Sequence, residues 1–222
     1  MNDACPPSRR QKFRLALECF GLFVVAPAGG AAAHLPVAVI PMLLLMALGC
    51  GLVLRFHYHM AWREFVCPPV PAREWWRVLA IYAIALPCLL GFLWLLEPGA
   101  LFSLVRKHPG LWLLLMAGYP LLSVIPQELI YRAFFFRRYR GLFGEGSGLV
   151  LAGAALFGLG HVLFHNWPSV LLSFLGGCLF GITYQRTSSL LVASVEHALY
   201  GCAVFTLGYG AFFFDDTMRA FR

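Results

Sequence analysis

The chain has 222 residues, of which 60% are hydrophobic and only 12% are charged, and its mean hydropathy is +0.76. Soluble domains are about 45–50% apolar and about 25% charged, so this composition excludes an ordinary soluble domain. It also excludes a disordered chain, which would carry less Leu and Phe and more charge. The net charge of +7 is typical of basic loops on the cytoplasmic side of a membrane protein. We therefore expect contact with the lipid bilayer and no nucleic acid partner.

The cysteines are odd in number and form no CxxC pair, so they do not predict a disulfide scaffold or a metal site. Most lie inside apolar runs, where we expect them to be small core residues. They are Cys5, Cys19, Cys50, Cys67, Cys88, Cys178 and Cys202.

Seven apolar stretches predict an all-α, polytopic membrane helical bundle. They cover residues 13–31, 35–54, 78–96, 111–126, 149–165, 168–184 and 190–214. Several approach the ~20 residues that a helix needs to cross about 30 Å of hydrocarbon, and none alternates as a transmembrane strand would. The first stretch is the weakest, because Pro27, Gly29 and Gly30 interrupt it.

The connecting segments predict the orientation. The longest, residues 55–77, mixes arginines with His, Tyr and Trp, a composition that suits the membrane–water interface. If the N-terminus is cytoplasmic, twelve Lys and Arg residues fall on the inside and four on the outside, leaving out Arg132. The positive-inside rule therefore predicts a cytoplasmic N-terminus.

Few ionisable residues interrupt or closely flank the apolar stretches outside the basic loops. A charge at the bilayer centre costs at least about 2.5–3.5 kcal/mol, so such residues are functional candidates by default. They are Glu18, Glu128, Arg132, His161, His165, Glu196 and His197. All but Glu18 lie in the C-terminal half, which predicts that any chemistry is confined to residues 119–201.

Glu128 and Arg132 are four residues apart, so on a helix they share one face and can pair. The alternative is an ion pair that only lowers the cost of burial. By the same helical rise, Glu128 lies roughly 3 Å beyond the end of its apolar stretch. Either this helix runs one or two turns further, or it breaks at Pro120 or Pro126 to line a water-filled cavity.

His161 follows a glycine-rich face that would let another helix approach closely. His165 lies one turn later, where it can simply cap the span. Glu196 and His197 are adjacent and point in different directions on a helix. For each of these histidines, a hydrogen-bonded core residue is the alternative to a catalyst.

Together these spans supply a carboxylate and two imidazoles, from Glu128, His161 and His197. A carboxylate beside a histidine can take a proton from water, and a further imidazole can donate to a developing oxyanion. These groups predict hydrolysis of an amide by an activated water, with no cofactor required. The same three residues could instead form a His₂Glu zinc site.

Three motifs carry a resemblance to a known family: Gln127–Arg132, Phe157–His161 and His197–Gly201. Their order and spacing resemble the EExxxR, FxxxH and HxxxN pattern of the CPBP (CAAX protease and bacteriocin-processing, Abi) family of intramembrane glutamic endopeptidases. The resemblance implies that Glu128 and His161 activate water, that His197 stabilises the oxyanion, and that Arg132 pairs with the carboxylate. It also implies a membrane-associated peptide or protein as substrate and a bacterial cytoplasmic membrane as location.

By this resemblance we divide the chain into N-terminal membrane helices with a basic interfacial loop (1–110), a catalytic core (111–214) and a short tail (215–222).

Two positions depart from the family pattern. Gln127 stands where the family often has the first glutamate, and an amide cannot act as a base. Gly201 stands where an asparagine is often found, which removes one oxyanion donor, and Cys202 or Tyr200 are the neighbours that could replace it. These departures leave open a catalytically degenerate membrane binding or immunity protein. A proton-coupled transporter that uses the same buried groups is a further alternative.

Overall fold

The computed structural model describes residues 8–32 and 39–213, and within this part of the chain it is all-helical. Seven of the described helices are long and apolar enough to cross a membrane, which confirms the predicted polytopic bundle. They span Arg9–Ala32, Val39–His57, Ala72–Leu96, Pro109–Phe143, Ser147–Phe164, Trp167–Thr187 and Leu190–Leu207. The predicted tail, residues 215–222, lies outside the described residues.

The first two spans each contain a π-helical segment. The first consists of α1 (Arg9–Phe20), a π segment (Gly21–Val25) and α2 (Ala26–Ala32), and it continues through the Pro and Gly residues that weakened its prediction. The second consists of α3 (Val39–Leu52) and a π segment (Val53–His57). The short α4 (Trp62–Val66) occupies the connecting segment before α5 (Ala72–Leu96), and α6 (Ser103–Lys107) precedes the fourth span.

The fourth span is much longer than its apolar stretch predicted. It runs through α7 (Pro109–Tyr119), a π segment (Pro120–Val124), α8 (Ile125–Glu128), a second π segment (Leu129–Phe134) and α9 (Phe135–Phe143). The helix does not break at Pro120 or Pro126, because the π segments absorb the missing backbone donors without ending the helix. The boundary at residue 126 was therefore wrong, and Glu128 lies well inside a span.

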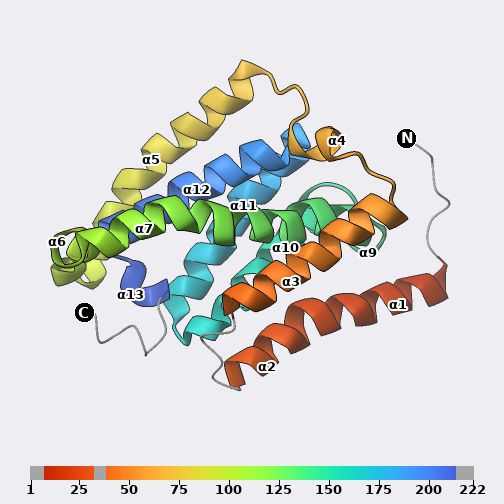
Figure 1. Cartoon of the computed structure of the whole chain (residues 1–222), viewed down its shortest axis with the longest axis horizontal. Coiled ribbons are helices and arrows are strands. Elements are labelled where there is room, and N and C mark those ends of the chain that lie inside the picture. Colours follow the sequence, from red (N-terminus) through yellow and green to blue (C-terminus); the bar gives the residue numbers. More distant parts are fainter. Residues whose placement is uncertain (1–7, 33–38, 214–222) are drawn as a thin grey trace.

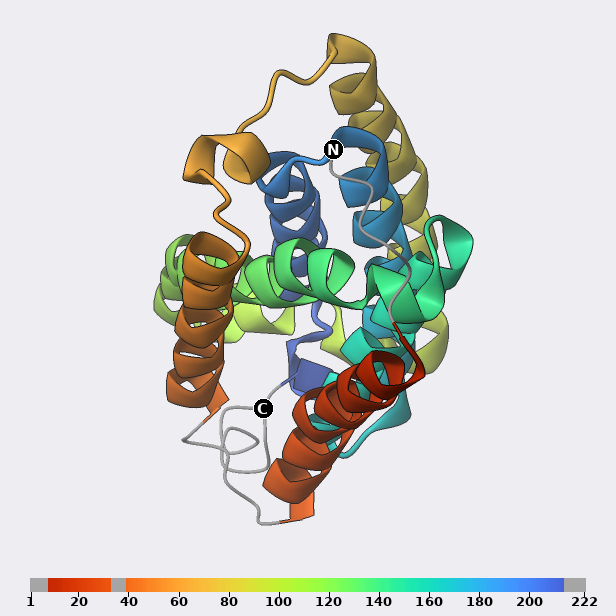
Figure 2. The same cartoon turned by 90° about the vertical axis from the view of Figure 1, so that its right-hand side faces the viewer.

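The last three spans form the centre of the molecule. They are α10 (Ser147–Gly160), extended by a 3₁₀ turn (His161–Phe164), then α11 (Trp167–Thr187) and α12 (Leu190–Leu207), which is followed by the short α13 (Gly210–Phe213). Figures 1 and 2 show α11 and α12 inside the bundle, between α5 on one side and α1 and α2 on the other. About two-thirds of α12 is buried within the protein, whereas α5 is mostly exposed.

Glycines allow α10 and α11 to pack closely. A Cβ on Gly177 would lie 2.9 Å from the Ala154 Cα, and one on Gly158 would lie 3.1 Å from the Phe174 Cβ. Such close approach is typical of membrane helices, where van der Waals packing replaces the hydrophobic effect. It fixes the positions of Phe157 on α10 and Phe180 on α11, which face the site described below.

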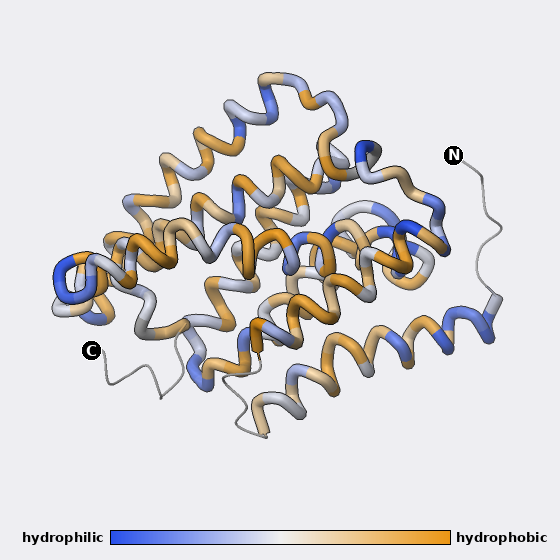
Figure 3. Tube along the Cα trace, in the orientation of Figure 1, coloured by the Kyte–Doolittle hydropathy of each residue, from blue (hydrophilic) through white to orange (hydrophobic). Residues whose placement is uncertain are grey.

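Polar contacts tie the outer helices to this centre. Glu18 on α1 accepts hydrogen bonds from Arg138 and Tyr139 on α9, at 2.6–2.9 Å. Glu74 on α5 pairs with Arg186 on α11 at 2.8 Å. Glu18, a functional candidate from the sequence, is thus a link between helices. Figure 3 shows hydrophobic residues along the bodies of the spans, and hydrophilic residues at the start of α1 and around α6.

Candidate active site

Glu128 lies at the C-terminal end of α8 and is completely buried. Its Oε1 accepts a hydrogen bond from the Nδ1 of His197 on α12, at 2.9 Å. Its Oε2 forms an ion pair with the Arg132 Nε one turn later, at 3.2 Å. Each oxygen of the carboxylate therefore has one charged or polar partner, and the pair predicted between Glu128 and Arg132 is present.

Arg132 is also completely buried, beside two neighbouring aromatic rings. Its guanidinium lies 5.3 Å from the Phe157 ring centroid and 5.9 Å from that of Phe180. Its Nη1 donates to the Tyr131 carbonyl oxygen at 3.2 Å. Because the aromatic faces attract the cation, the guanidinium is held in place beside the carboxylate of Glu128 with few hydrogen bonds.

His197 is held by partners on both ring nitrogens. Its Nδ1 faces Glu128, and its Nε2 lies 3.0 Å from the hydroxyl of Tyr119 on α7. The ring stacks on Phe180 with 4.5 Å between centroids, and Phe157 meets it edge-on. The tautomer and the orientation of His197 are thus set by the surrounding side chains.

His161 follows the last residue of α10 and opens the 3₁₀ turn. Its Nδ1 donates to the Phe157 carbonyl oxygen at 2.8 Å, because a carbonyl can only accept. A neutral imidazole bound in this way keeps a lone pair on Nε2. Since His161 lines the cavity described next, this nitrogen is suited to accept a proton from a water molecule there.

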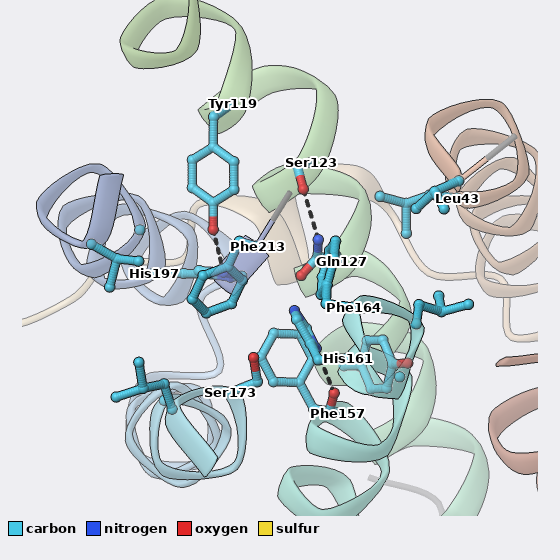
Figure 4. Close-up of a pocket in the computed structure, with 18 of the residues that line it drawn as sticks. Leu43, Tyr119, Ser123, Gln127, Phe157, His161, Phe164, Ser173, His197 and Phe213 are labelled. Atoms are coloured by element: carbon cyan, nitrogen blue, oxygen red, sulfur yellow. Dashed lines mark hydrogen bonds between the residues drawn. The ribbon is translucent and has the colours of Figure 1, made fainter. Parts of the chain in front are cut away.

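A large, mostly apolar cavity of about 1450 Å³ reaches into the bundle beside these residues. The polar groups on its wall come from several helices and include Tyr119, Ser123, Gln127, His161, Ser173 and His197 (Figure 4). The Gln127 amide nitrogen donates to the Ser123 hydroxyl at 2.7 Å, and its Oε1 is buried with no hydrogen-bond partner among the described residues. An unpaired acceptor on the wall of a cavity is suited to bind water.

The structure brings Glu128, Arg132 and His197 into direct contact and places His161 beside them, with the Phe157 ring touching both histidines. The resemblance implied that Glu128 and His161 share a water. In the structure the carboxylate pairs with His197 instead, and Gln127 rather than Glu128 lines the cavity. The two residues are adjacent on one helix and therefore point in different directions, which explains this difference.

The other candidates lie around this centre. His165 has a left-handed backbone, with φ of 52°, at the turn before α11. It lines the cavity but does not belong to the group formed by Glu128, Arg132 and His197. Glu196 is completely buried, and neither of its carboxylate oxygens has a hydrogen-bond partner among the described residues. Among those residues there is also no group of three or more His, Cys, Asp or Glu side chains that could hold a metal ion.

Tyr119 is the site residue that the sequence did not indicate. It lies nine residues before Glu128, a spacing of two and a half turns that predicts opposite faces of a regular α-helix. The intervening π segment, Pro120–Val124, changes this phase and brings both side chains to His197. Only the two prolines in this stretch could have signalled the irregularity.

The described residues thus combine seven candidate membrane spans with a buried group of Glu128, Arg132 and His197, and His197 lines the cavity. Residues 108–203 match the family model described as type II CAAX prenyl endopeptidase Rce1-like, which confirms the predicted resemblance. The match covers all three sequence motifs. No curated protein and no solved structure matches the chain significantly.

Proposed function

We propose that this protein is an intramembrane endopeptidase that hydrolyses a peptide bond of a membrane-associated peptide or protein. The observation that carries the proposal is the polar group of Glu128, Arg132, His161 and His197, assembled from three spans beside a cavity large enough for a peptide segment. A span can be built from Leu at much lower cost, so a buried group of this kind favours function over structure. The Rce1-like match over the same residues supports the same activity.

In the proposed mechanism, the His161 Nε2 and the Gln127 Oε1 hold the attacking water. His161 accepts one proton as the water oxygen bonds to the scissile carbonyl carbon. The histidine then returns this proton to the leaving amine as the C–N bond breaks, so that protons balance over the cycle. Hydrogen-bond donors beside His197 stabilise the oxyanion in between.

Glu128 acts through His197 in this scheme. Its carboxylate holds the Nδ1–H and stabilises a positive charge on the imidazole, while Arg132 keeps the carboxylate in place. The cationic ring then strengthens any donor bound to its Nε2. We place the protein in a bacterial cytoplasmic membrane with its N-terminus in the cytoplasm, on the distribution of basic residues and the family resemblance.

The test compares the termini of membrane proteins, by mass spectrometry, in cells that carry wild-type protein, His161→Ala, Glu128→Gln or His197→Ala. We expect new termini with the wild-type protein and none with the three variants. Two matched controls, His57→Ala and Glu145→Gln, change exposed residues far from the cavity and should behave as wild type. Each variant must first elute as a folded protein. Unchanged termini with His161→Ala would contradict the proposal.

A second function is favoured by one observation, because the amide of Gln127 lines the cavity where a carboxylate would be the stronger base. A degenerate family member would bind a membrane partner without cutting it. Its signature would be a stable complex with the wild-type protein and new termini only after Gln127→Glu. The same comparison of termini therefore separates the two functions.

A further inference from the structure

We infer that Tyr119 supplies the oxyanion hydrogen bond of this enzyme, as the last member of a Glu128–His197–Tyr119 chain. This inference rests on the proposed peptidase function and assigns a further catalytic residue to it. It stands on three observations of the structure: the place of the hydroxyl, the charge behind it, and the space that Gly201 leaves for the ring.

The Tyr119 hydroxyl lies on the wall of the cavity, 3.0 Å from the His197 Nε2. This contact occupies the only free nitrogen of the His197 ring, because Nδ1 is bound to Glu128. The imidazole therefore has no N–H left to offer a substrate in the cavity. The hydroxyl of Tyr119 is the donor on this wall in direct contact with His197, and Figure 4 shows it directed at His197.

The hydrogen-bond chain of Glu128, His197 and Tyr119 is suited to stabilise a developing negative charge. When His197 is cationic, its Nδ1–H donates to Glu128 and its Nε2–H donates to the Tyr119 oxygen. The phenolic O–H is then free to donate to the oxyanion, and a charge-assisted neighbour makes it a stronger donor. No proton leaves or enters this chain when the oxyanion forms: His197 keeps both of its protons and the phenol keeps its own while it donates.

Gly201 makes room for this arrangement. It lies one turn after His197 on α12, and a Cβ built on it would overlap the Tyr119 ring, at 2.6 Å from Cζ and closer still to the hydroxyl. An asparagine at this position, as in the family motif, would thus exclude Tyr119 from its place. We infer that Tyr119 takes the place of the asparagine amide that Gly201 lacks. Neither Cys202 nor Tyr200 is then needed to replace that amide.

The first test removes only the hydroxyl. Tyr119→Phe should lower the rate at which wild-type-dependent termini accumulate, per amount of folded protein, by about 10²–10³-fold, the usual loss of one oxyanion donor. Tyr58→Phe is the matched control, because it deletes the same atom outside the cavity. A Tyr119→Phe protein as fast as wild type, with His161→Ala inactive, would overturn this inference and leave the proposed function intact.

The second test exchanges the donor. Gly201→Asn alone should be inactive, because its side chain collides with the Tyr119 ring, and Tyr119→Ala alone should be as slow as Tyr119→Phe. The double variant Tyr119→Ala/Gly201→Asn should recover at least about tenfold over either single variant, because the amide takes the place of the phenol. A double variant no faster than the slower single variant would overturn the inference that Tyr119 replaces an amide donor at position 201.

A third measurement does not depend on activity. In ¹⁵N-histidine-labelled protein in micelles, the His197 Nε2 resonance, assigned with His197→Gln, should move on Tyr119→Phe and stay in place on Tyr58→Phe. An unmoved resonance would overturn the chain. If the wild-type protein itself produced no new termini, the proposed function would fail and the catalytic role of Tyr119 would fail with it.

Discussion

The Gln127 side chain on the cavity wall has a buried acceptor with no hydrogen-bond partner among the described residues. Its amide can orient a water molecule but cannot accept a proton from it. Proton transfer in the proposed mechanism therefore depends on His161 alone. Enzymes that add a positioned base to such a step gain typically 10²–10⁴-fold.

We therefore expect Gln127→Glu to raise the cleavage rate, by up to about 10²-fold, because the new carboxylate would share the water with His161. The measurement is the rate at which new termini appear in pulse-labelled cells. Gln127→Met, which removes the acceptor at similar length, should slow cleavage. A slower Gln127→Glu variant would contradict the assignment of the water to this part of the cavity.

Arg132 is the residue whose loss should most affect stability. Its removal leaves the buried carboxylate of Glu128 with only His197 as a partner. Breaking a buried pair on one side typically costs about 3–5 kcal/mol, so Arg132→Leu should lower the free energy of unfolding by about this amount in detergent titrations. Arg140→Leu, at a half-exposed surface pair, should change it by less than about 0.5 kcal/mol.

At the scale of residues, the sequence predicted which charged residues meet at the site better than it predicted the uncharged ones. Glu128, Arg132 and His197 meet as expected from their rarity inside apolar spans, because burial of a charge forces it to find a partner. Tyr119 carries no such signal, since a tyrosine in a membrane span is ordinary. Which of two adjacent residues, Gln127 or Glu128, faces the cavity depends on helix rotation, which composition does not determine.

At the scale of elements, the close contact of α10 with α11 supports the site. It holds Phe157 and Phe180 next to each other, where both rings contact Arg132 and His197. The glycine-rich face before His161 predicted an approach of this kind. The fourth span was less predictable, because Glu128 and Arg132 interrupt its apolar stretch and are buried by other parts of the protein.

Gly177→Ala should destabilise the protein by about 1–3 kcal/mol, because the added methyl group meets the Ala154 backbone and forces the two helices apart. Gly91→Ala on α5 is the matched control, since nothing lies within 4 Å of its added Cβ. It should be neutral or slightly stabilising. Thermal unfolding midpoints in the same detergent compare the two, and equal midpoints would contradict the packing argument.

At the scale of the whole molecule, the seven spans and the basic residues together predict the orientation of the site. Cys67 lies exposed between α4 and α5, on the side that we expect to be cytoplasmic. The arginines of this connecting segment contribute four of the twelve basic residues on that side. Seven helices could be counted from hydropathy alone, whereas their lateral order could not, because all seven present similar apolar surfaces.

In a variant that keeps Cys67 as its single cysteine, a membrane-impermeant maleimide should react in inside-out vesicles and not in intact spheroplasts. A second variant, with Lys107→Cys as its single cysteine, should show the reverse, because α6 lies at the predicted outer side. Reaction of Cys67 in spheroplasts would invert the orientation and move the basic segments outside.

The π segment Pro120–Val124 has a consequence for how this helix tolerates changes in its length. A π turn holds more residues than an α turn, so it behaves as a single-residue insertion into a regular helix. Deleting Leu121, which is largely exposed, should restore regular winding and leave Tyr119 and Glu128 eight residues apart, which is about 80° around a regular helix. Both residues could then still reach His197, so the deletion variant should keep activity. Replacing Leu121 with Ala should also keep activity, so this helix should tolerate the loss of one residue at the π segment as well as a change of side chain.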